Sequence, residues 1–475
     1  MMRSLFSGVS GLKNHQTRMD VIGNNIANVN TTGFKSGRVN FTDMLSQTLT
    51  GASSPNDNIG GTNPKQIGLG SSVGSIDTIF TNGSVQSTGQ NTDLCMSGNG
   101  LFVVNNGKQQ FYTRNGDFQF DANGNYVQAG SGLYVQGWMA DDNGSLTTNG
   151  ATTNIVVEAG KIMAAKATKN ADFTLNLNAA EPTIDKITLT DASTNPPTIT
   201  TPNSAKIAND KQSITLSMSD GSTKTIGSVS PLTYTVGNSV PLVTNLTVYD
   251  SVGNGHTVNV MLEKAGANTW YASLNGVNGV DTSTIDEDDG TTTTVTMSKT
   301  LIPFKSDGTY DDKTGGAGNI SLTYTNGAAD QSVIANFSAL TQYSGSNTAK
   351  GIADGYAAGT LSSLAVDKSG IITGTYTNGQ KKSEAQVAVA QFDNASGLTK
   401  NGDSLYQESN NSGVPNIRTA SDLGVTITPA ALEMSNVDVA DQFTDMIVTQ
   451  RGFQSNSKII TVSDEMLETV VNMKR

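Results

Sequence analysis

The side chains most often used in catalysis and metal binding are scarce in this chain of 475 residues. It has one cysteine, Cys95, and two histidines, His15 and His256, so an internal disulfide is impossible and a histidine-rich metal site is excluded. The acidic residues at positions 286–289 offer oxygen ligands of the kind that bind Ca²⁺, but they lack the EF-hand spacing and are better interpreted as a solvated loop. We therefore predict no metal site and no cofactor.

No nucleophile, base and orienting group form a recognisable set, so the sequence predicts a protein that is not an enzyme. Cys95 adjoins an apolar strand and is interpreted as a small buried hydrophobe rather than a reactive thiol; the sequence leaves open whether it is linked covalently to a neighbouring molecule. His15 is expected to be a packed or channel-facing polar residue rather than a pH sensor, and His256 to lie at the surface. The stretch Gly68–Gly74 has the wrong spacing for a nucleotide loop.

The strongest pattern lies at the two ends of the chain, where apolar residues recur every seven positions. Such a repeat is typical of helices that bury a narrow seam against other helices. The predicted seam consists of Leu5, Leu12, Met19, Ile22, Ile26 and Val29 near the N-terminus, and of Val439, Phe443, Met446, Phe453, Ile460, Leu467 and Val471 near the C-terminus. We expect one helix over residues 3–30, with a stop at Gly33, and another from Ser435 or Asn436 to Asn472.

The two end segments carry opposite charge, which predicts that they meet. Residues 1–45 contain five basic and two acidic side chains, a net charge of +3, whereas residues 430–475 contain four basic and seven acidic ones, a net charge of −3. Gly8, Gly11 and Gly23 each weaken the first helix by about 1 kcal/mol relative to alanine, so that helix is marginal alone. The ends are expected to become ordered on packing against many neighbouring copies, with a coiled-coil stalk in a dimer as the alternative.

Between the ends, turn residues and short apolar runs predict β structure. Leu101–Val104 is expected to be a strand, and Asn115-Gly116 predicts a two-residue hairpin that joins 111–114 to 117–120. The density of Asn-Gly turns favours a compact antiparallel barrel or sandwich over residues 73–150. Residues 50–72 are expected to be an extended connector, preceded by one or two helical turns at 41–45.

Residues 151–365 are rich in threonine and turn residues, with strands expected at 245–250, 256–261 and 269–273. The stretch 281–300 is expected to be an exposed loop. Beyond residue 365, a hairpin at Asn378-Gly379 and a buried strand at 386–391 are expected to complete the β domain that begins at residue 73.

The predicted fold is therefore a multidomain α+β protein with a coiled-coil inner domain and mainly antiparallel β-barrel or sandwich domains. Its expected parts are an inner helical domain of 1–34 with 432–475, a connector of 35–72, a middle β domain of 73–150 with 365–431, and one or two outer β domains in 151–364.

The formal net charge of −12 argues against a nucleic-acid partner, which would require a basic face. No apolar run reaches the ~18 residues that a membrane helix needs. The N-terminal residues lack the continuous apolar core and the cleavage site of a secretory signal peptide. We therefore predict no membrane insertion and, for any export, a route without a cleaved leader.

Motifs at both ends resemble the axial proteins of the bacterial flagellum, the family of rod and hook subunits. The matching stretches are Ser7–Leu12, Asp20–Asn28, Thr32–Lys35, Leu432–Asp438 and Met446–Asn456, with Leu94–Val104 and Phe111–Gly116 resembling the family's first β domain. The length of the chain, with Leu246–His256 and Gln450–Asn456, resembles the hook branch rather than the shorter distal-rod branch. The resemblance fades over 184–235 and 275–350.

The resemblance implies a structural subunit of the flagellar hook, a curved, flexible helical tube that transmits motor torque from rod to filament. It implies that the terminal helices line an export channel, that the middle β domain surrounds them, and that 151–364 faces outward. Implied partners are further copies of the chain, the hook cap, distal-rod and hook–filament junction proteins, and the type III export apparatus. The alternatives are a distal-rod subunit and, from another class, a secreted β-rich adhesin with a coiled-coil stalk.

Overall fold

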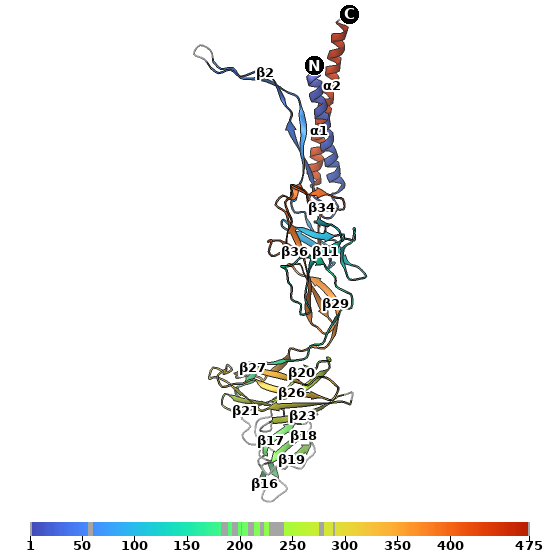
Figure 1. The fold of residues 1–475 in the computed structure, drawn as a ribbon. Coiled ribbons are helices and arrows are strands. Elements are labelled where there is room, and N and C mark those ends of the chain that lie inside the picture. Colours follow the sequence, from blue (N-terminus) through green and yellow to red (C-terminus); the bar gives the residue numbers. More distant parts are fainter. Residues whose placement is uncertain are drawn as a thin grey trace. The chain divides into compact units, whose positions relative to one another are not determined.

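A computed structural model of the chain describes residues 2–55, 60–181, 189–191, 198–200, 202–207, 213–218, 223–227, 242–274, 280–287 and 290–473. Contacts within these residues divide the chain into two compact units. The first unit contains residues 1–161 and 361–475, and the second contains residues 162–360 (Figure 1). The finer division into inner, connecting, middle and outer domains stays a prediction.

Both predicted terminal helices are present in the first unit. α1 spans Met2–Ala27 and α2 spans Val439–Asn472. The start of α2 lies at Asp438 rather than at Ser435 or Asn436, because the Asp438 carboxylate accepts hydrogen bonds from the free N–H groups of Ala440 and Asp441. α1 ends three residues earlier than expected, and Gly33 adopts a positive φ of 67° beyond it.

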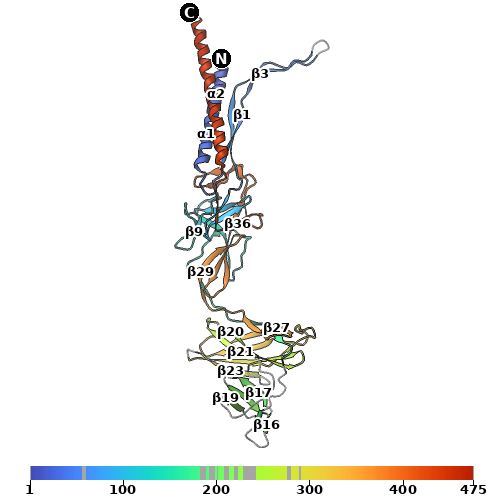
Figure 2. The same ribbon diagram turned by 180° about the vertical axis from the view of Figure 1, so that it is seen from behind.

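The described residues between 37 and 78 include two antiparallel strand pairs, where helical turns and an extended connector were expected. β1 (Gly37–Asp43) pairs with β4 (Ser71–Thr78), and β2 (Ser46–Thr50) pairs with β3 (Lys65–Gly68). Figures 1 and 2 both show β2 and β3 extending away from the helices. The helical turns predicted at 41–45 are wrong because the residues of β1 are paired, one after another, with residues of β4.

The main sheet of the first unit combines strands from before residue 150 with strands from after residue 360. Its neighbouring strands are, in order, β29 (Gly359–Val366), β30 (Ile371–Tyr376), β31 (Lys381–Val387), β11 (Tyr134–Met139), β7 (Leu101–Asn105), β8 (Gln110–Thr113), β34 (Leu405–Gln407) and β33 (Thr399–Lys400). The strand at 101–104 and the hairpin at Asn378-Gly379 are confirmed. The described strands form an open sheet and not a closed barrel.

Short strands complete the first unit. They are β9 (Phe118–Phe120) with β10 (Tyr126–Gln128), β12 (Thr153–Asn154) on β11, β32 (Val389–Gln391) with β35 (Asn416–Arg418), β5 (Val85–Ser87) with β37 (Ala431–Glu433), and β6 (Leu94–Ser97) with β36 (Thr426–Pro429), together with the short 3-10 helix Ala395–Gly397. The pairs β5–β37 and β6–β36 hold the segment before α2 against residues 85–97.

The hairpin predicted at Asn115-Gly116 is wrong. β8 pairs with β7 and β34, whereas β9, which follows the Asn-Gly pair, pairs with β10. Gly116 is needed for close packing and not for a positive φ, since an added Cβ would lie 1.7 Å from the carbonyl oxygen of Leu94. The chain at this point therefore crosses closely over β6 instead of folding back on itself.

The second unit consists mainly of two sheets packed around one apolar core. The four-stranded sheet contains β20 (Leu242–Tyr249), β21 (Gly255–Gly266), β22 (Thr269–Ser273) and β25 (Thr300–Pro303). The six-stranded sheet contains β23 (Val280–Asp286), β24 (Thr292–Ser298), β26 (Gly318–Tyr324), β27 (Gln331–Tyr343), β14 (Asn170–Asn178) and β28 (Lys350–Ala353). Phe173, Val260, Trp270 and Phe337 are among the core residues.

The three strands expected at 245–250, 256–261 and 269–273 are confirmed as parts of β20, β21 and β22. The exposed loop expected at 281–300 is wrong, because β23 and β24 pair along their whole length and bury Val295 and Met297. The many threonines here did not distinguish a strand from a loop, since threonine suits the solvent face of a sheet as well as a loop.

The remaining strands of the second unit are β13 (Ile162–Met163), β15 (Leu189–Asp191) with β16 (Thr198–Thr200), and the three-stranded sheet β17 (Pro202–Ile207), β18 (Ser213–Met218) and β19 (Thr223–Gly227). Among the described residues of both units, no helix combines the length and the apolar character that crossing a membrane requires.

Candidate assembly site on the terminal helices

α1 and α2 lie side by side and run antiparallel (Figures 1 and 2). Their contact line includes several small and polar residues. Thr449 and Ser463 are the buried residues of α2, and a Cβ added to Gly452 would lie 2.6 Å from Cε1 of His15. A Cβ added to Gly11 would lie 2.7 Å from Nδ2 of Asn456. The glycines therefore allow the two helices to approach closely, as small residues do at helix interfaces in general.

Polar contacts fix the register of the helices. The Arg18 guanidinium lies 2.9 Å from the Asp445 carboxylate, with both side chains partly exposed. Asn25 is buried and its amide donates to Gln442 Oε1 and to the carbonyl of Gly37, each at 2.9 Å. These contacts show that the two ends of the chain meet, as predicted, and that the contact includes an ion pair and an amide–amide hydrogen bond.

The structure places the predicted seam residues in three groups. Ile22 is buried. Leu5, Leu12, Met19, Ile26, Val29, Met446, Ile460 and Leu467 are half-buried. Val439, Phe443, Phe453 and Val471 are exposed. Within one copy the helix contact runs past Thr449, Gly452, Asn456 and Ser463, and it leaves these last four seam residues exposed. Their role as a seam between copies stays a prediction.

The outward surface of α2 is unusually apolar for a helix of a free monomer. Its exposed apolar residues, each between 37% and 81% exposed, are Val439, Phe443, Ile447, Val448, Phe453, Ile459, Val462, Met466, Val470, Val471 and, just after the helix, Met473. We call this set the α2 apolar surface. A helix that leaves this many apolar side chains exposed in a single copy offers surface that other molecules can cover.

A buried ion cluster anchors the segments that lead into both helices. The Lys35 ammonium lies 2.7 Å from Oε1 of Glu433, and Nη1 of Arg114 lies 3.3 Å from Oε2 of the same carboxylate. All three side chains are at most 1% exposed. Lys35 also donates to the carbonyl of Thr81, and Arg114 to those of Met96 and Gly98. Two cations therefore share one carboxylate and several carbonyl dipoles.

Burial governs the titration of this cluster. It lowers the pKa of Lys35 and of Arg114, because a buried cation loses its hydration, while Glu433 opposes the shift. Cys95 lies close by and is 1% exposed, and burial, assisted by the negative charge of Glu433, raises its pKa to about 11. The thiol is thus neutral and enclosed, which confirms its interpretation as a small buried hydrophobe.

The sequence missed the ion cluster, although Lys35, Arg114 and Glu433 all lie within the family-like motifs. Each is a lone charge in an otherwise apolar or turn-rich stretch, and that is the only signal that they are buried. His15 is half-buried in the helix contact, where its Nδ1 has no hydrogen-bond partner among the described residues. Of the two expectations for His15, a packed or a channel-facing polar residue, the contact with α2 supports packing.

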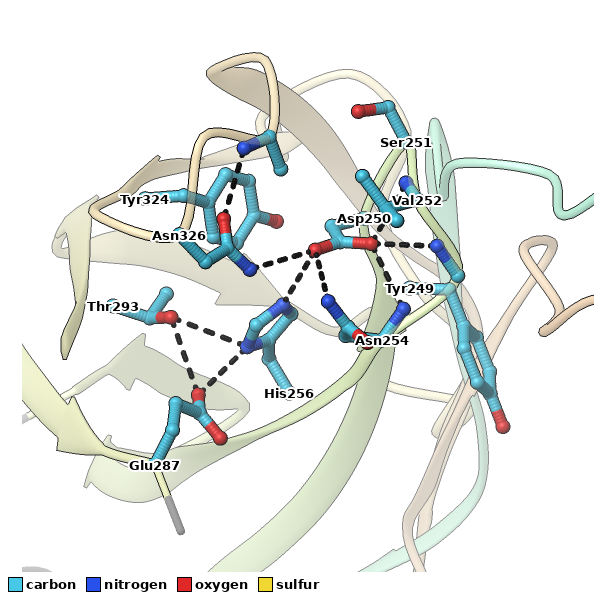
Figure 3. A network of polar contacts seen from close by, with 12 residues as sticks. Tyr249, Asp250, Ser251, Val252, Asn254, His256, Glu287, Thr293, Tyr324 and Asn326 are labelled. Atoms are coloured by element: carbon cyan, nitrogen blue, oxygen red, sulfur yellow. Dashed lines mark hydrogen bonds and ion pairs between the residues drawn. The ribbon is translucent and has the colours of Figure 1, made fainter. Parts of the chain in front are cut away.

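His256 is wrongly predicted to be a surface residue. It is 1% exposed and lies between the carboxylates of Asp250 and Glu287 in the second unit (Figure 3). Among the acids at 286–289, Asp286 ends β23 and Glu287 contacts His256, while 288 and 289 lie outside the described residues. In the part of the chain that the structure describes, no cluster of three or more histidine, cysteine or acidic side chains is arranged to hold a metal ion.

Four family models match successive parts of the chain. They are described as flagella basal body rod protein (residues 5–35), flagellar hook protein FlgE/F/G D1 domain (95–217), flagellar basal body protein FlaE D2 domain (223–356) and flagellar basal body rod FlgEFG protein C-terminal (428–473). The fold and these matches define a non-enzymatic, structural protein of the bacterial flagellum.

Full-length relatives identify the branch. The chain is 40% identical to the flagellar hook protein FlgE of Borreliella burgdorferi and 38% identical to that of Treponema pallidum, in each case over 100% of both chains. It is 30% identical to the flagellar basal-body rod protein FlgG of Bacillus subtilis, again over 100% of both chains. The chain belongs to the flagellar hook protein family, and it is a structural hook subunit.

Proposed function

We propose that the chain polymerises through its terminal helices into the curved, flexible tube of the hook. The α2 apolar surface is the observation that carries this proposal. Eleven apolar side chains that remain at least 37% exposed in a single copy gain about 25 cal/mol for each Å² of surface that neighbouring copies cover. A contact between two different surfaces that does not close on itself generates a helical tube.

In this proposal different residues of α2 have different roles. Thr449, Gly452 and the facing residues of α1 hold the hairpin of one subunit together, while Phe443, Phe453 and Val471 contact other subunits. The helices then form the inner tube around the export channel. The β strands of 73–150 and 365–431 form the layer around them, and 151–364 forms the outer layer.

The segment from β1 to β4 suits a bridging role between subunits. Leu45, just before β2, is 85% exposed, and Leu49, in β2, is 53% exposed. Burying them against a neighbouring copy would let this segment bridge two subunits. Sliding between the polar outer parts of adjacent subunits would then permit bending while torque passes along the tube.

The same proposal includes a route of export and a set of assembly partners. A chain with one cysteine and with no internal disulfide can pass unfolded through the type III export apparatus. The proposed site of action is the flagellar hook outside the cell, reached without a cleaved signal peptide. The hook cap, the distal rod and the hook–filament junction proteins are the proposed partners at the growing and finished ends.

Electron microscopy of the full-length protein after salt-induced assembly tests the proposal. Short tubes with a narrow channel and variable curvature are expected. Straight, rigid tubes would favour a distal-rod subunit, and persistent monomers or dimers, even with the cap protein added, would favour the stalked adhesin. A chain that lacks residues 436–475 should form no tubes; tubes from that truncated chain would contradict the role of α2.

A further inference from the structure

The turn between β33 and β34 holds the chain segment that follows α1. The Ser404 hydroxyl donates to the carbonyl of Thr32 at 3.3 Å. The Lys400 ammonium donates to the carbonyl of Lys35 at 3.0 Å and lies 4.8 Å from the centre of the Phe34 ring. The turn and the strand residue before it therefore contact three positions of the segment through which α1 joins the β strands.

The backbone of this turn is left-handed at three successive residues. The angle φ is 82° at Gly402, 47° at Asp403 and 56° at Ser404. Glycine adopts such angles freely, whereas residues that carry a Cβ adopt them only at a cost in energy. A cavity of about 430 Å³ is lined by this turn and by residues 28–34. The turn is therefore strained, and it adjoins open space into which it can move.

Asn401 and Gly402 begin the turn, and their side-chain amide and backbone nitrogen are both free. The two residues are exposed to solvent. Among the described residues, neither the Asn401 side chain nor the Gly402 N–H has a hydrogen-bond partner. Because glycine has no side chain, nothing on Gly402 hinders the approach of its nitrogen to Cγ of the preceding asparagine. The pair therefore has the composition and the freedom that an intramolecular reaction requires.

We propose that Asn401 is a site of spontaneous deamidation. The Gly402 nitrogen bonds to Cγ of Asn401 and closes a cyclic imide, while Nδ2 leaves as ammonia and takes the proton of the attacking nitrogen. Water then opens the imide. Attack at Cγ gives aspartate, and attack at the backbone carbonyl carbon gives isoaspartate, in which Cβ and Cγ become part of the main chain. Either product adds a carboxylate to the turn.

Other exposed Asn-Gly pairs of the chain differ from this one in a single respect. At Asn106-Gly107 the glycine N–H donates to the side chain of Asn105 at 2.7 Å. At Asn143-Gly144 it donates to the carbonyl of Asp141 at 2.9 Å. A nitrogen held in this way reacts only while its hydrogen bond is open, and one such bond lowers the open fraction about 2- to 10-fold. Asn149-Gly150 is exposed and has no such bond among the described residues, so it should react as Asn401 does.

Deamidation at Asn401 should weaken the hold of the turn on the segment after α1. The longer main chain of isoaspartate allows Asp403 and Ser404 to leave the left-handed region, which removes their strain. That movement carries the Ser404 hydroxyl away from the carbonyl of Thr32. The modification thus acts at a point where the β strands contact the exit of α1.

Peptide mass spectrometry of the full-length, unassembled protein, aged in mildly alkaline buffer, tests the site. In the folded protein Asn401 should deamidate about 2- to 10-fold faster than Asn106 and Asn143. In urea-unfolded protein the three should convert at similar rates, because the hydrogen bonds that distinguish them are gone. Equal rates in the folded protein would overturn the proposal. A difference that persists in urea would also overturn it, because the fold would not be its cause.

Hydrogen–deuterium exchange tests the effect on the exit of α1. The matched control is Asn401→Gln, since the longer glutamine side chain closes such a ring far more slowly, and deamidation at Asn149 is common to both proteins. The amides of 31–36 should exchange equally in the two fresh proteins. After ageing they should exchange about 2- to 10-fold faster in the protein that carries isoaspartate at position 401, the effect of one lost hydrogen bond. Equal exchange after ageing, with isoaspartate present, would overturn the proposed effect on the α1 segment.

Discussion

The ammonium of Lys35 and the carboxylate of Glu433 lie 2.7 Å apart, although 398 positions separate them in the chain. The two residues stand just after α1 and just before α2, so their contact fixes where both helices leave the β strands. Arg114 shares the carboxylate from the end of β8, which ties the main sheet to the same point. The cluster therefore couples three segments that are distant in sequence.

Replacing the shared carboxylate should strongly destabilise the first unit. Glu433→Gln leaves two buried cations without their counter-charge, and we expect a loss of about 3–5 kcal/mol in the free energy of unfolding. Ellipticity at 222 nm reports this unit, because both long helices belong to it. The matched control is Asp445→Asn, which breaks the partly exposed pair with Arg18 and should cost less than about 1 kcal/mol. Equal losses in the two variants would contradict the cluster's structural role.

Acidification should loosen the helix pair through His15. Burial, with help from the positive charge of Arg18, lowers the pKa of His15 below its ordinary value of 6.5. The folded state therefore binds fewer protons than the unfolded state below pH 6.5, so stability is full above that pH and falls as the pH drops toward the folded pKa. The melting temperature of the unassembled protein at pH 7 and pH 5 measures the effect. His15→Gln should show a smaller decrease, and an identical decrease would exclude His15 as the cause.

The close approach of the helices should make Gly452 intolerant of a side chain. Gly452→Ala places a Cβ 2.6 Å from Cε1 of His15, so the helices must separate or the ring must move. Gly23→Ala is the control, because nothing lies within 4 Å of its added Cβ and alanine favours the helix by about 1 kcal/mol. Thermal melting followed at 222 nm should place Gly23→Ala above the unmodified protein and Gly452→Ala below it. The reverse order would contradict the packing described above.

The α2 apolar surface should act in assembly and not in the folding of one copy. Phe443 is 50% exposed, so Phe443→Ser should leave the monomer's melting temperature within a few degrees of its original value. Losing the burial of this ring between subunits should cost about 1–2 kcal/mol, which raises the critical concentration for tube formation about 5- to 30-fold. Sedimentation of the assembled tubes measures that concentration. Gln450→Ser, at an exposed polar position of the same helix, is the control and should assemble normally.

Local patterns were sufficient for the elements whose environment is set by near neighbours. The heptads located both helices, and alternating residues located β20, β21 and β22. Local patterns gave wrong predictions where a segment distant in the sequence provides the neighbouring strand or backbone. Residues 41–43 are part of a strand because β4 lies beside them. Asn115-Gly116 passes over β6, where the carbonyl of Leu94 occupies the space of a side chain.

The sequence by itself determined that the two ends form helices that meet, that β strands lie between them, and that the chain resembles the flagellar axial proteins. These properties follow from the periodicity of apolar residues, the charge of each end and short sequence motifs, all of which can be read without knowing the fold. Only the tertiary structure decided which residues the helices bury and which they expose, because the glycines at positions 11 and 452 select a contact line that the heptads do not show. It also decided that Lys35, Glu433 and His256 are buried, since a charge is enclosed only when several distant segments supply its partners.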